Sequence, residues 1–233
     1  MDEGARRDTD KRLKIWDLPV RLFHILLIAL VCVQWYTGEN MGIATPDLVE
    51  IHIWSGCTLL ALVLFRITWG FLGSTTAKFT HFVKGPVTIL RYTGTLFSKS
   101  KPWVGHNPLG GLSVVLMLGF FLAIPVTGLF SADDEIPGFG PSGPLSHMVS
   151  DDTSFELASL HHDLWDVAFI LILIHIAAVL FYTVYKGHFI IAAMISGESE
   201  EAPAETLTFR PVWMALLVLA VTSGAVALAV TQL

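Results

Sequence analysis

The chain has 233 residues, of which 53% are hydrophobic and only 15% are charged, and its formal net charge is −6. Its mean hydropathy of +0.64 is far above that of an ordinary soluble domain, so a soluble helical bundle is disfavoured and an integral membrane protein is expected. The acidic balance gives no reason to expect a nucleic-acid partner.

Five apolar runs are long enough to cross about 30 Å of hydrocarbon. They fall at residues 20–37, 50–71, 108–130, 157–184 and 211–231. Lipid offers backbone N–H and C=O groups no hydrogen-bond partners, and these runs are too long for the short alternating strands of a barrel. The predicted fold class is therefore an all-α helical bundle that spans the membrane.

The positive charges predict the orientation of these spans. With five spans, all fourteen Lys and Arg residues fall on one side, which the positive-inside rule assigns to the cytoplasm together with the N-terminus. The two outer loops, 38–49 and 131–156, and their helix mouths hold only acidic charges, at Glu39, Asp47, Glu50, Asp133, Asp134, Glu135, Asp151, Asp152 and Glu156. An outer partner is therefore expected to be basic.

The chain divides into four expected segments. Residues 1–14 form a polar cytoplasmic tail, 15–190 the main helical domain, 191–209 an acidic cytoplasmic linker and 210–233 the fifth transmembrane helix. Within the cytoplasmic loop 72–107, FVKGPVTILRYTGTLF is predicted to form an interfacial helix with Pro86 near its first turn.

The two cysteines suggest neither a disulfide framework nor covalently attached haem. Cys32 and Cys57 both lie in predicted spans, and no Cys-x-x-Cys-His motif occurs. We interpret both as apolar core thiols.

Four of the nine histidines lie inside predicted spans, at His24, His52, His161 and His175. An unpartnered ionisable ring is costly to place in a membrane, so such residues indicate a functional site. The histidines at 81, 106, 147 and 188 lie in loops or at span ends, where a solvated role is the default.

The spacing on the fourth span indicates which of its histidines act together. His161 and His175 are fourteen residues apart, roughly 21 Å along the axis and about 40° short of four full turns, so both rings face one side. His162 is about 140° out of phase with His175 and points elsewhere. We therefore select His161 and expect His162 to flank it.

Depth in the membrane then pairs the rings. His24 and His175 lie toward the cytoplasmic side, whereas His52 and His161 lie level with each other toward the outer side. Two bis-histidine sites at two depths fit two b-type haems, because neutral imidazole is a strong axial ligand and two of them leave no open position on the iron.

Three further residues are candidates for binding the cofactor. Arg21, one turn before His24, and Arg66, near the cytoplasmic end of the second span, could pair with haem propionates. The alternative for both is snorkelling toward lipid headgroups. Gly56, one turn after His52, would let a porphyrin approach the backbone, although glycine also serves helix packing.

Several motifs resemble those of the bacterial cytochrome b561 proteins and the b-type cytochrome subunits of Ni,Fe-hydrogenases. They are WDLPVRLFH (16–24), WYTGE (35–39), IHIWSG (51–56), FRITWGFLGS (65–74), GHNPLGG (105–111) and LHHDLWDVAFILILIH (160–175). The resemblance covers roughly residues 15–190 and implies a four-helix core that holds two non-covalent haems b. It gives His24 and His175 as ligands of the inner haem and His52 and His161 as ligands of the outer one, while the fifth helix lies outside this core.

The resemblance implies electron transfer between the quinone pool and a periplasmic redox partner, in a bacterial inner membrane. The acidic outer face favours a basic c-type cytochrome as that partner. A membrane-bound hydrogenase and a superoxide:quinone oxidoreductase activity are the alternatives within this class, so the chain is either an electron carrier or a subunit of a quinone-linked oxidoreductase. A metal-ion transporter is the alternative from another class.

Overall fold

The computed structural model describes residues 13–40, 46–98, 103–132, 142–199 and 206–232. Within these ranges, five helices are long and apolar enough to cross a membrane, as the sequence predicts. They are α1 (Leu18–Glu39), α2 (Pro46–Leu72), α5 (Pro108–Phe130), α6 (Asp151–Leu180), which continues through the π-helical turn η4 (Phe181–Tyr185), and α8 (Val212–Gln232). The protein is an all-α, multi-pass membrane bundle.

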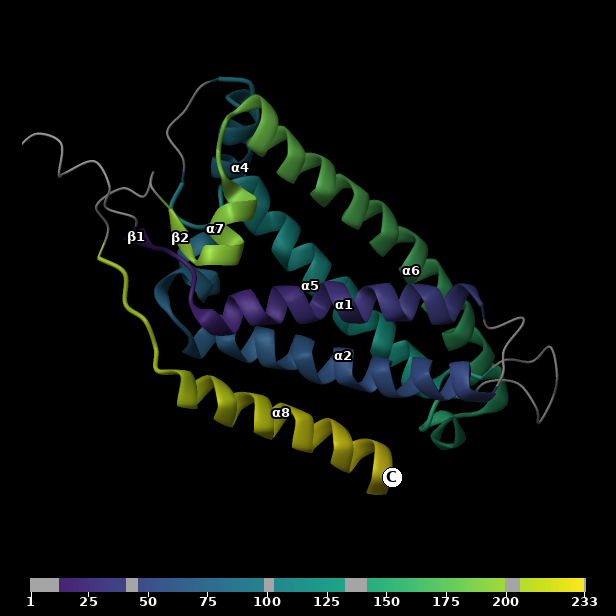
Figure 1. Cartoon of the computed structure of the whole chain (residues 1–233). Coiled ribbons are helices and arrows are strands. Elements are labelled where there is room, and N and C mark those ends of the chain that lie inside the picture. Colours follow the sequence, from purple (N-terminus) through teal and green to yellow (C-terminus); the bar gives the residue numbers. More distant parts are fainter. Residues whose placement is uncertain (1–12, 41–45, 99–102, 133–141, 200–205, 233) are drawn as a thin grey trace, which may run out of the picture.

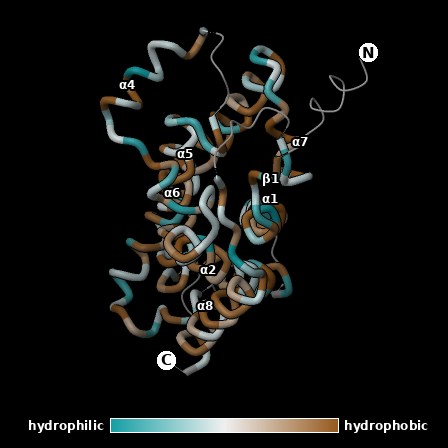
Figure 2. Tube along the Cα trace, turned by 90° about the vertical axis from the view of Figure 1, so that its left-hand side faces the viewer, coloured by the Kyte–Doolittle hydropathy of each residue, from teal (hydrophilic) through white to brown (hydrophobic). Residues whose placement is uncertain are grey.

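The spanning helices pack in a chain of neighbours (Figure 1). α1 lies along α2, α2 also contacts α5, and α5 lies along α6. α8 packs on α2 at one edge of the bundle, and the other four helices lie together on one side of α8. The faces of these helices that lack a neighbour remain apolar, and hydrophobic colour predominates along the long helices in Figure 2, as expected of surfaces that contact lipid.

Short elements cover one end of the bundle. They are η2 (Thr75–Ala77), α3 (Phe79–Phe82), α4 (Pro86–Gly94) and α7 (Ile190–Ser196), with a two-stranded antiparallel ribbon of β1 (Leu13–Lys14) and β2 (Glu198–Ser199). α4 falls within the segment predicted to be a helix, with Pro86 at its start. A hydrogen bond of 2.7 Å between the hydroxyls of Tyr92 and Tyr182 joins α4 to the end of α6.

The first turn of α1 is fixed by a buried carboxylate. Asp17 is 2% exposed, and its Oδ1 accepts a hydrogen bond from the backbone N–H of Val20, which caps the helix. Its Oδ2 accepts a second bond, at 2.9 Å, from Nε1 of Trp69 on α2. One side chain therefore both starts α1 and ties it to the last turns of α2.

The structure differs from the sequence prediction at the fourth span and at one cysteine. α6 begins at Asp151 rather than at 157, because the Ser150 hydroxyl accepts a hydrogen bond from the N–H of Thr153 and caps the helix. Of the thiols, Cys57 is buried, but Cys32 is exposed on α1, so the prediction of a core position is wrong for Cys32. η3 (Ser146–Met148) precedes α6.

Part of the predicted linker 191–209 is regular structure. α7 covers all of its first six residues, and β2 follows after one residue to pair with β1 in front of α1. Three acidic residues of the predicted outer loops, Asp133, Asp134 and Glu135, lie outside the described residues, as do most of residues 1–14.

Candidate haem-binding site

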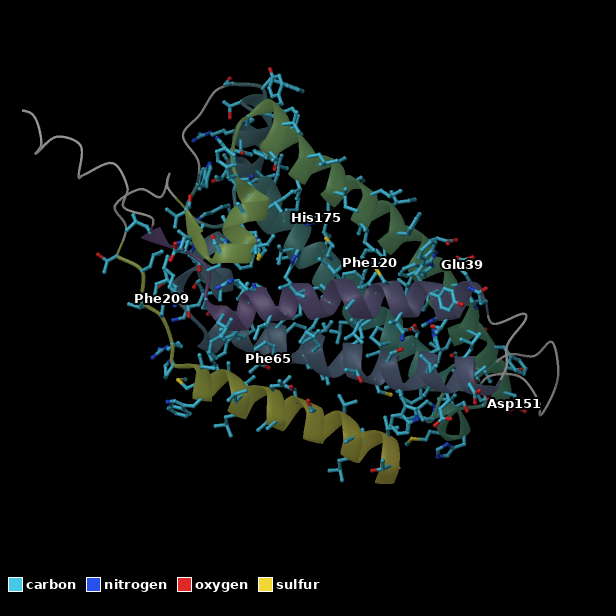
Figure 3. All side chains as sticks on the ribbon, in the orientation of Figure 1. Glu39, Phe65, Phe120, Asp151, His175 and Phe209 are labelled. Atoms are coloured by element: carbon cyan, nitrogen blue, oxygen red, sulfur yellow. The ribbon has the colours of Figure 1, made fainter. Side chains whose placement is uncertain are left out.

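Two pairs of histidine rings face each other between the helices. His24 on α1 lies 6.5 Å from His175 on α6, measured between ring centroids. His52 on α2 lies 6.2 Å from His161, which is also on α6. All four side chains are half-buried, and Figure 3 shows His175 directed from α6 toward the neighbouring helices. The structure thus brings together the pairs that depth and helical phase predict.

These separations suit a metal centre held by two imidazoles. Metal–imidazole bonds are about 2.0–2.1 Å long, so two of them span about 4 Å, and the distance from each ring nitrogen to its ring centre supplies most of the rest. Rings in direct stacking contact could lie closer together. The donor set of each pair therefore fits the axial ligands of one iron porphyrin.

The proton position on His161 leaves a nitrogen free to bind metal. Its Nδ1 lies 2.8 Å from the backbone carbonyl oxygen of Ile124 on α5. A carbonyl can only accept, so Nδ1 carries the proton and donates it, and the lone pair of the neutral ring is on Nε2. Fixing the tautomer through the distal nitrogen in this way is typical of metal-binding histidines.

His162 does not share this arrangement. Its side chain is exposed, and its ring centroid lies 5.9 Å from that of His161, at nearly a right angle. The structure therefore places only one of the two adjacent histidines against α2.

Arg66 is buried near the end of α2, and its charge acts on His106, on which His24 and His175 also act. Its side chain is only 2% exposed, Nη1 donates to the Ala77 carbonyl at 3.2 Å, and the guanidinium lies near the rings of Phe79 and Phe82. This placement differs from the snorkelling alternative, which would keep the guanidinium in water.

Arg21 lies on α1 one turn before His24 and reaches α7. Its Nη2 donates to the carbonyl of Ile195, while its Nε is buried without a partner among the described residues. A buried guanidinium N–H in this position has unused capacity to bind a carboxylate.

The two glycines near the histidines have different neighbours. A Cβ on Gly56 would meet the side chain of Gln34 at 3.6 Å, an ordinary contact, so this face of α2 lies against α1. Close porphyrin approach at Gly56 stays a prediction. On α5, a Cβ on Gly128 would lie 2.9 Å from Cε1 of His161, so Gly128 is the glycine that makes room for this histidine ring.

His106 lies in a more enclosed position than its place in a loop predicts. Its ring centroid is 4.8 Å from those of both Trp16 and Phe82, and its Nδ1 is buried with no hydrogen-bond partner in the described part of the chain. Burial, followed by the positive charge of Arg66, lowers the pKa of His106 to about 3. The expectation of a solvated histidine is therefore wrong for His106, which is neutral near pH 7.

Sequence patterns do not reveal the groups that contact the His52 and His161 rings. Thr37, whose hydroxyl lies 2.9 Å from Nδ1 of His52, is within the WYTGE motif but carries no signal of its role, and the Ile124 carbonyl is invisible in any sequence. Gly128 could have been noticed as a small residue in an apolar helix. Within the described part of the chain, no group of three or more His, Cys, Asp or Glu side chains is placed to hold a metal ion.

Comparison with known proteins gives one family and several relatives. The family model described as Prokaryotic cytochrome b561 matches residues 15–197. A protein of Bradyrhizobium diazoefficiens named "Probable Ni/Fe-hydrogenase B-type cytochrome subunit" is 22% identical over 225 residues, covering 84% of this chain and 90% of the relative. A protein of the same name from Rhizobium leguminosarum bv. viciae is 24% identical over 222 residues, covering 84% and 92%.

A more distant match is the "Probable Ni/Fe-hydrogenase 1 B-type cytochrome subunit" of Escherichia coli K12, which is 22% identical over 150 residues and covers 54% of this chain and 64% of the relative. No solved structure matches the chain at a significant level.

Proposed function

Because the chain belongs to the prokaryotic cytochrome b561 family, we propose that its two histidine pairs each bind one non-covalent haem b and that the protein carries electrons across a bacterial inner membrane. The observation that carries the proposal is the pairing of four half-buried rings at centroid distances of 6.5 and 6.2 Å. The two imidazoles of each pair would leave the iron of a haem b no open position for a substrate, so the bound group would supply one-electron transfer.

The residues of the chain have separate roles in this proposal. His24 with His175, and His52 with His161, would ligate the two irons. Arg66 and Arg21 would pair with propionate carboxylates near the first pair, because a buried guanidinium is stabilised by an anion that satisfies its N–H groups.

We place the end that carries β1, α4 and α7 in the cytoplasm. Lys14, Arg21, Lys84 and Lys186 lie at this end of the chain's spans, in agreement with the positive-inside rule. The opposite end is acidic, and Figure 3 shows Glu39 and Asp151 there. Quinone or quinol dissolved in the bilayer would exchange electrons with one haem, and a periplasmic protein with the other.

The acidic end favours a basic c-type cytochrome as the periplasmic partner. Opposite charges speed encounter between redox proteins, and salt screens the effect. The test is to reduce the purified protein, mix it with a basic cytochrome c and follow oxidation of the haems at low and high ionic strength. We expect a much slower reaction at high ionic strength, and equal rates would contradict electrostatic docking.

The names of the relatives favour a second partner, a membrane-bound hydrogenase. Both longer matches cover most of this chain and are named as hydrogenase cytochrome subunits. In that case electrons would flow from the outer enzyme to quinone. Mild-detergent purification from the native membrane distinguishes the two: copurification of a large Ni,Fe subunit supports the hydrogenase, and its absence together with salt-dependent oxidation by cytochrome c supports the c-type cytochrome.

A further inference from the structure

α1 holds α2 at the turn that carries His52. The side-chain amide of Gln34 donates one hydrogen bond to the backbone carbonyl of His52, at 2.8 Å, and another to the hydroxyl of Ser55, at 2.5 Å. One turn further along α1, the hydroxyl of Thr37 lies 2.9 Å from Nδ1 of the His52 ring. Gln34 therefore fixes the backbone at His52, and Thr37 contacts its side chain.

The protons in the Thr37–His52 contact can be assigned from the other neighbours. The Thr37 hydroxyl has a single proton, and its oxygen lies 2.8 Å from the carbonyl of Val33, which can only accept. The hydroxyl therefore donates to Val33 and presents a lone pair to the ring. His52 must then donate from Nδ1, which leaves the lone pair of the neutral imidazole on Nε2.

We propose that Thr37 is the positioning residue for His52 as a haem ligand. The proposal rests on the proposed function, since it takes Nε2 of His52 as an iron ligand. Thr37 fixes the tautomer and the orientation of the ring, and by accepting the Nδ1 hydrogen bond it makes Nε2 more basic. A more basic ligand donates more electron density and stabilises ferric over ferrous iron, so Thr37 lowers the reduction potential of this haem.

A substitution of Thr37 tests the proposal directly, because the other three histidine rings make different contacts. The Nδ1 of His161 donates to the backbone carbonyl of Ile124, which no side-chain substitution removes. Neither His24 nor His175 makes a hydrogen bond to another residue within the described ranges. Thr37 itself is only 2% exposed, so water does not readily take its place.

Two variants distinguish the effect of the Thr37 hydroxyl from that of its methyl group, and a third serves as the control. Thr37→Val keeps the shape and removes the acceptor, and Thr37→Ser keeps the acceptor. Thr58→Val is the matched control, because the Thr58 hydroxyl bonds only to the Trp54 carbonyl of its own helix. For each purified protein, the haem content per chain is measured and the reduction potentials of both haems are determined by spectroscopic redox titration.

We expect Thr37→Val to raise the potential of one haem and leave the other unchanged. Haem affinity at that site should fall as well, by about 10- to 100-fold, the usual effect of removing a partner of a metal-binding histidine. Thr37→Ser and Thr58→Val should match the unmodified protein. Loss of one haem in Thr37→Val with recovery in Thr37→Ser would equally support the proposal.

Two results would overturn it. One is unchanged potentials and haem content in Thr37→Val; the other is an equal defect in Thr37→Ser, which would make the hydroxyl irrelevant. If Thr37→Val does not fold, Thr37→Ala makes the same comparison. If the Thr37 proposal fails but the unmodified protein binds two haems, the proposed function is not contradicted. If the unmodified protein binds no haem, the proposed function itself is contradicted.

Discussion

Individual residues of α5, a helix with none of the paired histidines, help to shape the candidate site. α5 has no histidine, yet it supplies the carbonyl that fixes the His161 tautomer and, at Gly128, the space for that ring. The regular geometry of a helix lets sequence predict which rings share a face. Which neighbour touches those rings depends on how two helices pack, and sequence alone does not give that.

Gly128→Ala should displace His161. Its Cβ would lie 3.1 Å from Nδ1 of the ring, a tight contact, and 2.9 Å from Cε1, closer than real Cβ contacts, so the ring must shift away from Gly128 and leave its position opposite His52. We expect haem content to fall from two to one per chain. Gly119→Ala on the same helix is the control, because nothing lies within 4 Å of its added Cβ. Two haems retained in Gly128→Ala would contradict this account.

His106 should make the protein less stable in acid. Its pKa is lowered in the fold, so below the ordinary value of about 6.5 the unfolded chain binds a proton that the folded chain does not. The neutral His106 therefore stabilises the fold fully above about pH 6.5. This stabilisation is lost as the pH falls toward the pKa of His106 in the folded protein, about 3. Between pH 7 and 5 the loss is about 1–2 kcal/mol.

Unfolding of the unmodified protein and His106→Phe, followed at pH 7 and pH 5, checks this expectation. The phenylalanine keeps the packing against Trp16 and Phe82 and removes the titrating group. The variant should lose less stability on acidification. An identical loss in both proteins would show that His106 is protonated as easily in the fold as in the unfolded chain.

At the scale of elements, Asp17 connects α1 to α2. Asp17→Ala removes the helix cap and leaves the buried N–H of Trp69 without an acceptor, so we expect a loss of about 2–4 kcal/mol in the free energy of unfolding. Asp17→Asn has one side-chain oxygen and can satisfy only one of the two donors, so its loss should be smaller. Denaturant unfolding of the three proteins gives the comparison, and equal stability of Asp17→Ala and the unmodified protein would contradict it.

The sequence predicts the ends of a helix well where hydropathy determines them and less well where a capping residue determines them. The sequence predicts all five spanning helices, but it places the start of α6 six residues late because the polar residues of its first turns do not raise hydropathy. Ser150 followed by Asp151 and Asp152 is a helix-start pattern that would have given the observed boundary. The exposed position of Cys32 could not be read from a helix that is apolar on all sides.

For the whole molecule, α8 packs on α2 on the side away from α6, while α1, α2 and α6 supply all four paired histidines. A chain that ends after Arg210 should therefore still bind two haems. It should melt at a lower temperature, because removing α8 uncovers the face of α2 that packs against Ala215 and Val226. Haem content and thermal unfolding of the shortened protein test both statements, and loss of haem would make α8 part of the haem-binding unit.

We propose above all that two bis-histidine haems b lie in this bundle, with His161 rather than His162 as a ligand. The most direct test is a pyridine haemochrome assay of haem b per chain for the purified protein, His161→Ala and His162→Ala. We predict two haems in the unmodified protein, one in His161→Ala and two in His162→Ala. An absence of haem b from the unmodified protein, or the loss of a haem in His162→Ala but not in His161→Ala, would contradict it.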